Sequence, residues 1–377
     1  MNQASKRVIV IGAGYAGTAA AKVLDKNFDV TLIEKRERFF HNVGSLRAAV
    51  DAGWLRKLFI PYDHLLKNGQ VVNGKVKGAT PGEVSLEDGR RWKFDYLILA
   101  TGGNYPFPAK TASDKIAEAE VAVRLVNERV AQAQSILLIG AGPVGIELAG
   151  EITSAYPGKP VTMIDPGDRL MPAFNPELGD RLYKGLQKLG VRILFGEKLA
   201  NMPAETNDTG PEQPSLQDYI TEKGTRIKAD IHFICFGLHL NTEYLQPQLG
   251  SILDERGQVK VNSHLQVLGH ENIFAIGDIA NTREPKLITT ASAHASIVAE
   301  NIKRLAAKDP ILREHHPKKA ATVIVPLGTS GGAVQLPVGK KGIVLGAWAA
   351  SWLKGKELRT KRRWKALGVK LDKDIFD

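Results

Sequence analysis

Residues 8–17 read Val-Ile-Val-Ile-Gly-Ala-Gly-Tyr-Ala-Gly, and residues 136–145 read Ile-Leu-Leu-Ile-Gly-Ala-Gly-Pro-Val-Gly. In each stretch a short apolar run meets three glycines, and a segment with helical periodicity follows. A second apolar run then ends in an acid, Glu34 after the first stretch and Asp165 after the second. This repeated order of strand, glycine turn, helix, strand and acid predicts an internal duplication.

The spacing of the glycines has a mechanical reason. The first glycine of each set allows a tight turn, the second lets a pyrophosphate approach the backbone, and the third lets the helix pack against the strand. The helix N-terminus offers free N–H groups to phosphates, and the acid accepts hydrogen bonds from ribose hydroxyls. One such motif is weak evidence, but two predict two dinucleotide sites, built by Gly12, Gly14, Gly17 and Glu34 and by Gly140, Gly142, Gly145 and Asp165.

Later segments extend the duplication. Residues 95–102 and 230–237 are matching apolar runs that end in small turns, as buried strands of a parallel sheet do. A third such run, residues 271–278, ends in Gly-Asp, and a helix is expected from about 289 to 306.

The 377 residues are enough for two or three domains. We therefore expect an α/β fold with two Rossmann-like dinucleotide-binding domains plus a small C-terminal domain. The first domain should comprise residues 1–113 and 248–310, with the second inserted as residues 114–247. Residues 311–377 should form the C-terminal domain.

The composition excludes several classes of protein. Cys235 is the one cysteine, so a disulfide framework, a Cys-rich zinc site and an internal dithiol are excluded, and no metal site is expected. The sequence contains no run of 18 apolar residues, so no transmembrane helix is predicted. No signal peptide is recognisable. We expect a protein of the cytoplasm or of the cytosolic surface of a membrane, and not a secreted one. The net charge of +11 favours acidic partners.

With these motifs, the chain resembles the two-dinucleotide-binding-domain flavoproteins, the pyridine nucleotide-disulfide reductase superfamily, over about residues 6–310. The resemblance implies FAD in the first domain and NAD(P)H in the second. In that family the carboxylate of the Gly-Asp pair holds the flavin ribityl chain, a role that falls to Asp278 here. The resemblance also implies cofactor contacts for Lys35 after the first acid and for the strand end formed by Ala100, Thr101 and Gly102.

A narrower resemblance comes from residues 39–48, where disulfide-reducing relatives carry cysteines and this chain has none. Phe-His-Asn-Val at 40–43 and Leu-Arg-Ala at 46–48 are similar to the apoptosis-inducing-factor-like, ferroptosis-suppressor-type quinone oxidoreductases. That group implies reduction of ubiquinone-like quinones by NAD(P)H at a membrane surface, with Asn42 and Arg47 at the cofactor. Asn2 stands where its animal members carry a lipidated glycine.

Two residues are candidates for catalysis. Glu147 lies one turn into the second glycine helix, where family members place a glutamate near the nicotinamide and flavin. Lys286 follows Asp278 in an expected loop over the flavin and could stabilise negative charge there. Asp165 should repel a 2′-phosphate, which favours NADH, whereas Arg169 could offset this repulsion and keeps NADPH as the alternative.

The C-terminal stretch combines apolar and basic residues. Residues 343–353 are mostly apolar with two tryptophans, and residues 354–365 hold seven basic residues and one acid. This combination suits an interfacial segment on anionic lipid. The alternatives are a core-packed helix with a solvated tail and nonspecific binding of nucleic acid.

Together these features predict an FAD-dependent NAD(P)H:quinone oxidoreductase that uses no redox disulfide. Two alternatives remain from the sequence. The chain could reduce a protein electron carrier, or it could be a redox-sensing flavoprotein with weak nucleic-acid or partner binding. The sequence leaves the quinone and the oligomeric state open.

Overall fold

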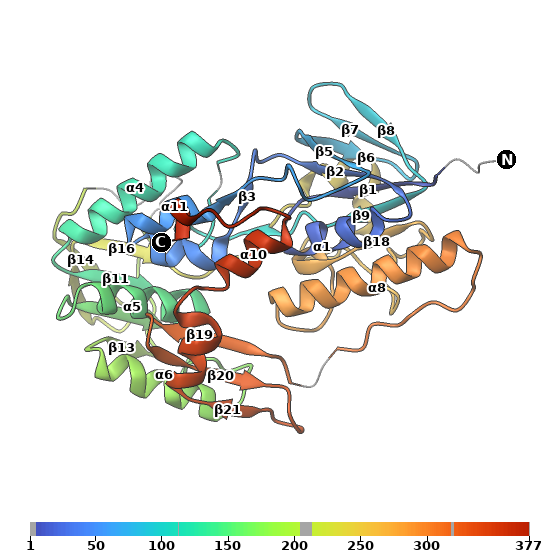
Figure 1. Cartoon of the computed structure of the whole chain (residues 1–377). Helices are drawn as coiled ribbons and strands as arrows, with labels where there is room; N and C mark the ends of the chain where they lie inside the picture. Colours follow the sequence, from blue (N-terminus) through green and yellow to red (C-terminus); the bar gives the residue numbers. More distant parts are fainter. Residues whose placement is uncertain (1–4, 112, 204–212, 318–319, 377) are drawn as a thin grey trace.

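The computed structural model describes residues 5–111, 113–203, 213–317 and 320–376, and Asn2 lies outside these ranges. Two parallel sheets dominate the described part of the chain (Figure 1). The inner strands of both sheets carry mostly apolar, buried side chains, as a parallel sheet covered on both faces requires, whereas the edge strands Gln70–Asn73 and Arg192–Phe195 are more exposed.

The first sheet has five strands in the order β18-β9-β1-β2-β5, and every neighbouring pair is parallel. Helix α1 (Tyr15–Leu24) follows β1 directly, with the first glycine turn between them. The strands are β1 (Arg7–Ile11), β2 (Asp29–Glu34), β5 (Gln70–Asn73), β9 (Tyr96–Leu99) and β18 (Ile273–Ala275).

The second sheet repeats the central part of the first in the order β13-β12-β11-β16, again wholly parallel. The first strand of each copy lies between the strand that ends in the acid and the later apolar strand, which confirms the duplication. The strands are β11 (Ile136–Ile139), β12 (Val161–Asp165), β13 (Arg192–Phe195) and β16 (Ile231–Ile234). The fold is therefore α/β, with Rossmann-type sheets as expected.

The longer helices are α4 (Ile116–Gln132), α5 (Pro143–Ala155), α6 (Pro176–Lys188) and α8 (Ile288–Ala306). Helix α8, expected from about 289, packs along α1 beside the first sheet (Figure 1).

Small antiparallel units surround the sheets: β3 (Phe39–Phe40) with β4 (Phe59–Ile60), β6 (Val76–Ala79) with β7 (Glu83–Leu86) and β8 (Arg91–Lys93), and β14 (Gln217–Ile220) with β15 (Arg226–Ala229). Short helices are η1 (Asn42–Gly44), α2 (Ser45–Ala48), η2 (Ala52–Trp54), α3 (Leu55–Leu58), η3 (Glu243–Leu245), α7 (Gln246–Leu249), η4 (Gly250–Ile252) and η5 (Gly277–Ile279).

The chain crosses between the two sheets twice, and the crossings pair with each other. Strand β10 (Gly103–Asn104) leads away from the first sheet and β17 (His239–Leu240) leads back to it. The two strands are antiparallel, with Gly103 opposite Leu240. This pairing ties the outgoing and returning crossings together next to the ends of β9 and β16.

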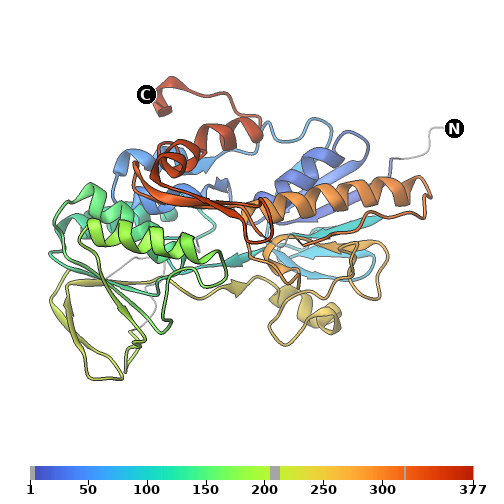
Figure 2. The same cartoon turned by 90° about the horizontal axis from the view of Figure 1, so that it is seen from below.

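The C-terminal unit bridges both halves of the molecule (Figures 1 and 2). It consists of a sheet of β19 (Val323–Leu327), β20 (Gly331–Leu336) and β21 (Ile343–Leu345), then α9 (Ala347–Ala350), the π-helical turn η6 (Ser351–Gly355), α10 (Thr360–Ala366) and α11 (Lys373–Phe376). Strand β19 packs on α5 so closely that a Cβ on Gly150 would lie 2.6 Å from the Cα of Leu327. At the other end, Arg363 of α10 donates to the hydroxyl of Thr18 on α1.

Among the helices of the described residues, none has both the length and the apolar character needed to cross a bilayer.

Candidate functional site

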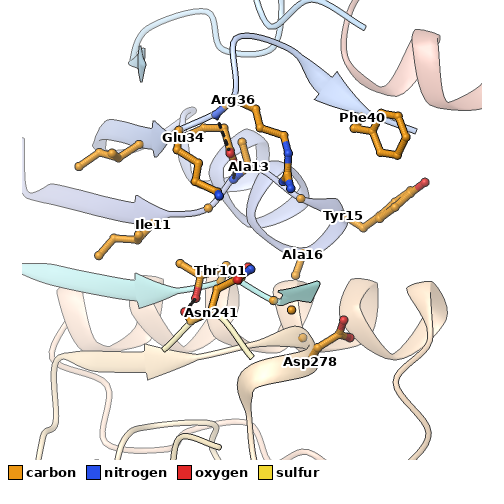
Figure 3. A pocket seen from close by; sticks show the side chains of 18 of the residues that line it. Ile11, Ala13, Tyr15, Ala16, Glu34, Arg36, Phe40, Thr101, Asn241 and Asp278 are labelled. Atoms are coloured by element: carbon orange, nitrogen blue, oxygen red, sulfur yellow. Dashed lines mark hydrogen bonds between the residues drawn. The ribbon is translucent and has the colours of Figure 1, made fainter. Parts of the chain in front are cut away.

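A cavity of about 550 Å³ lies at the carboxyl ends of the strands of the first sheet (Figure 3). Its walls come from the first glycine turn, the ends of β2, β9 and β18, and the N-terminus of α8. Ligands of open α/β sheets bind at this edge. The lining includes ten of the residues expected at the cofactor: Gly12, Gly14, Glu34, Lys35, Asn42, Ala100, Thr101, Gly102, Asp278 and Lys286.

Glu34 holds the first glycine turn in place. Its buried carboxylate accepts the N–H of Ala13 at 2.6 Å through Oε2 and that of Arg36 at 3.0 Å through Oε1 (Figure 3). Gly12 has a φ of +97°, which disfavours any residue with a side chain. A Cβ on Gly17 would lie 1.8 Å from the carbonyl oxygen of Gly12, so only glycine allows this approach of helix to strand.

The second glycine turn repeats this geometry. Asp165 accepts the N–H of Ala141 at 2.7 Å through Oδ2 and that of Gly167 at 2.8 Å through Oδ1. Gly140 has a φ of +107°, and a Cβ on Gly145 would lie 2.1 Å from the carbonyl oxygen of Gly140. Both turns therefore present free backbone N–H groups at a helix N-terminus, the arrangement that binds phosphate.

Lone polar atoms point to a ligand in the first cavity. The Nε of Arg36 and the Oδ1 of Asn42 are buried without a hydrogen-bond partner, and both residues line the cavity. Buried polar atoms are nearly always paired in folded proteins. A polar ligand with phosphate and hydroxyl groups would pair them, so the residues present fit a dinucleotide such as FAD.

Thr101 is held by its neighbour in the cavity wall, Asn241, a residue that the sequence did not single out (Figure 3). The Thr101 hydroxyl donates to the carbonyl of Asn241 at 2.6 Å, and the Asn241 amide donates to the carbonyl of Thr101 at 3.0 Å. Asn241 directly follows the returning crossing β17. Its only sequence signal would have been this position after the echoed strand.

Two lysines lie near Asp278 at the α8 end of the cavity. Lys286, expected from the sequence, donates to the carbonyl of Ala280 at 2.6 Å. Lys110, which sequence reasoning missed, donates to the carbonyl of Gly103. Burial lowers the pKa of both amines, and the Asp278 carboxylate acts in the opposite direction. Both lysines line the cavity, where their amines can offset negative charge at its α8 end.

Glu147 forms an ion pair with the C-terminal unit. Lys354 of η6 places its Nζ 2.6 and 2.9 Å from the two carboxylate oxygens of Glu147, and both side chains are largely buried. Burial raises the pKa of Glu147, although Lys354 pulls it back. Glu147 is not among the described residues that line the first cavity. Lys354 belongs to the stretch for which the sequence predicted a surface role.

Arg47 also lies away from the lining residues. Its guanidinium makes two parallel bonds of 2.9 and 2.8 Å to the buried carboxylate of Glu151 on α5 and donates to the carbonyl of Lys356 at 3.1 Å. Arg47 thus joins the first half, the second glycine helix and the C-terminal unit. A cofactor contact of Arg47 stays a prediction.

His41 connects the cavity with the C-terminal unit. Its Nδ1 accepts from the hydroxyl of Tyr15, a cavity residue, at 2.8 Å, and its Nε2 donates to the carbonyl of Leu358 at 3.1 Å. Burial lowers the pKa of His41 to about 3, so the ring is neutral at physiological pH.

Cys235 is buried directly after β16, and burial raises the pKa of its thiol to about 12. The thiolate is the reactive form of cysteine, so Cys235 is suited to packing rather than to redox chemistry.

Comparison with known proteins agrees with this geometry. The pyridine nucleotide-disulphide oxidoreductase family matches residues 6–295. Apoptosis-inducing factor homolog B of Dictyostelium discoideum is 36% identical, over 95% of this chain and 96% of its own length. Human ferroptosis suppressor protein 1 is 32% identical, over 96% and 95%. The solved sulfide:quinone oxidoreductase of Aquifex aeolicus has the same fold, with a TM-score of 0.74 at 19% identity over 97% of this chain and 92% of its own.

Proposed function

The chain belongs to the pyridine nucleotide-disulphide oxidoreductase family, and from that premise we propose that it is an FAD-dependent NAD(P)H:quinone oxidoreductase. The observation that carries the proposal is the pair of equivalent turns closed by Glu34 and Asp165. Two dinucleotide sites in one chain suit a bound flavin and an exchangeable nicotinamide. The single, deeply buried thiol favours direct transfer to an organic acceptor.

The first cavity is the proposed FAD site. The turn of Gly12, Gly14 and Gly17 would hold the pyrophosphate and Glu34 the adenosine ribose, with Lys35 near the adenine. Asp278 would bind the ribityl chain, while Lys286 and Lys110 offset negative charge at the other end. When bound there, FAD would supply the chemistry that links a hydride donor to an acceptor of two electrons.

The second turn is the proposed nicotinamide site. Asp165 keeps one carboxylate oxygen on Ala141 and the other on Gly167, and each oxygen has a further lone pair for a ribose hydroxyl. A 2′-phosphate would meet this negative charge, which supports NADH. The Nε and Nη2 of Arg169 are buried without a partner, so Arg169 is the residue that could admit NADPH.

Glu147 is proposed to act where the two cofactors meet, either by orienting the nicotinamide or by passing a proton. Lys354 would hold the carboxylate in position. The C-terminal unit would in that case complete the site, since Lys354 comes from η6. We also propose the domain organisation that the sequence predicts. Residues 1–113 and 248–310 would form the FAD domain, residues 114–247 the nicotinamide domain and residues 311–377 the C-terminal domain.

A quinone is proposed as the acceptor, and an anionic membrane surface as the place where it is met. The segment that supplies Lys354 also carries Trp348 and Trp352, which are 71% and 77% exposed. Large exposed apolar side chains mark interaction surfaces. A lipophilic quinone would enter beside such a surface.

The test follows the visible absorbance of the flavin in the purified protein. Anaerobic NADH should bleach it rapidly, and a short-chain ubiquinone should then restore it rapidly. Bleaching without recovery would reject the quinone and favour a protein electron carrier or a sensor. Absence of bleaching by NADH and NADPH would reject the oxidoreductase itself.

A further inference from the structure

Three potential metal ligands meet behind the first cavity. Glu284 lies in the loop before α8, His294 lies on α8, and His315 lies on the segment that follows it. The Oε1 of Glu284 is 2.9 Å from the Nε2 of His294 and 2.6 Å from the Nε2 of His315, and the two nitrogens are 3.3 Å apart. All three side chains are at least nine-tenths buried.

The hydrogen bonds define the protons of this cluster. The backbone N–H of Gly277 donates to the Nδ1 of His294 at 3.2 Å, so that nitrogen carries no proton and Nε2 does. His294 and His315 can then both donate to Glu284. Both bonds meet at one carboxylate oxygen, Oε1, so the two imidazoles converge on a single oxygen ligand.

The donor set and its spacing suit zinc. Two imidazoles and one carboxylate are common zinc ligands, with bonds of roughly 2.0–2.2 Å in a tetrahedral arrangement. Such bonds place neighbouring ligand atoms about 3.3 Å apart. The three separations of 2.6, 2.9 and 3.3 Å are close to this value, so small outward movements of the ligands would admit the ion.

We propose that Glu284, His294 and His315 form a binding site for a divalent cation of the zinc type, and that occupation of this site is coupled to the flavin cavity. A water would supply the fourth ligand. The cation would replace the protons that now lie between the three side chains. The site is separate from the proposed electron path and does not depend on the identity of the acceptor.

The coupling follows from the two nitrogens of His294. A neutral imidazole that binds a cation through Nε2 carries its proton on Nδ1. That proton would face the N–H of Gly277, so the hydrogen bond between Gly277 and His294 must break. Gly277 lines the cavity next to Asp278, and its φ is +74°. Zinc should therefore shift the backbone that contacts the flavin.

Zinc binding is measured by equilibrium dialysis of the flavin-loaded protein with elemental analysis, after removal of metals with a chelator. Wild type should bind one zinc per chain at this site. His315→Ala should weaken binding about tenfold or more. The neighbouring His316, 81% exposed and outside the cluster, supplies the control, because His316→Ala should bind as wild type does. Absence of binding to wild type, or equal loss in both variants, would overturn the site.

The coupling has its own readout. Zinc should shift the visible absorbance of the bound flavin in wild type and in His316→Ala, with the midpoint found by dialysis. His315→Ala should show no shift at the same zinc concentration while keeping its flavin. An unchanged spectrum in wild type that has bound zinc would overturn the coupling.

Discussion

At the scale of single residues, the protonation of His41 should make the stability of the folded protein depend on pH. Its folded pKa is about 3 against 6.5 for an exposed histidine. Between these values the unfolded chain binds more protons, so this residue's effect on stability worsens as the pH falls below 6.5. We expect His41→Gln to lose about 2 kcal/mol less unfolding free energy than wild type between pH 7 and pH 5. Urea titrations at both pH values measure the difference.

The control for this prediction is again His316, whose exposed side chain makes no buried contact. His316→Gln should lose as much stability on acidification as wild type does. If the loss in His41→Gln equals that of wild type, His41 is not the group whose protonation unfolds the protein.

Substitutions of Glu147 and Lys354 can separate the contribution of this ion pair to stability from its contribution to the rate of flavin reduction. Glu147→Gln leaves Lys354 buried without an anion, and breaking a buried pair costs about 3–5 kcal/mol. We expect lower thermal stability and a fall of about 100-fold in the rate of flavin bleaching by NADH. Glu147→Gln combined with Lys354→Met removes both charges, so it should recover stability but not rate.

The thermal midpoint and the bleaching rate are read on the same preparations. Lys354→Met alone shows the effect of losing both the ion pair and the hydrogen bond from Lys354 to the carbonyl of Ile324. If the double variant recovers its rate together with its stability, Glu147 serves the fold alone.

At the scale of elements, the two glycine turns should fail independently. Gly17→Ala places a Cβ 1.8 Å from the carbonyl oxygen of Gly12, and Gly145→Ala places one 2.1 Å from that of Gly140. Because each helix must then move off its own turn, Gly17→Ala should purify with less flavin. Gly145→Ala should keep its flavin and need at least about tenfold more NADH for half-maximal bleaching.

Flavin content per chain and the concentration dependence of bleaching test this pair of variants. Gly158→Ala is a control for substitution of glycine, since no atom lies within 4 Å of its added Cβ, although its φ of +84° costs some stability. Equal flavin loss in the Gly17 and Gly145 variants would contradict the separation of the two sites.

The elements that repeat were the predictable ones. The order of apolar strand, glycine turn and helix is a local pattern, so both turns and the central strands of both sheets could be predicted, and α8 could be predicted from the segment after the third apolar run. Asn241 and Lys110 could not be predicted in this way. Asn241 is placed by the pairing of β10 with β17, and Lys110 is buried near Asp278. Side chains brought together across 140 residues, as Thr101 and Asn241 are, have no local signal.

At the scale of the whole molecule, the C-terminal unit is more than a basic surface tail. Lys354 is paired inside with Glu147, and Arg363 stacks on the rings of Tyr15 and Phe39, 4.7 and 4.1 Å from their centroids. Composition predicted a charged segment but could not tell which cations turn inward. The apolar and basic residues that remain outside are those on which the membrane proposal rests.

Trp348 and Trp352 provide the test of that proposal. They are four residues apart and strongly exposed, and the exposed Lys340, Lys341 and Lys356 flank them in sequence. Interfacial tryptophans beside basic residues favour anionic lipid. We expect the protein to sediment with vesicles that contain phosphatidylserine, and the double variant Trp348→Ala/Trp352→Ala to bind at least about tenfold more weakly.

Salt and a matched apolar substitution decide how this surface binds. Raising the ionic strength should weaken vesicle binding of wild type, since exposed charges are screened. Ile311→Ala removes another strongly exposed apolar side chain, 71% exposed and distant in sequence from the two tryptophans, and should leave binding unchanged. If the tryptophan variant binds vesicles as wild type does but shows a smaller sedimentation coefficient in solution, the surface joins two copies of the chain. In that case the quinone must reach the flavin by another route.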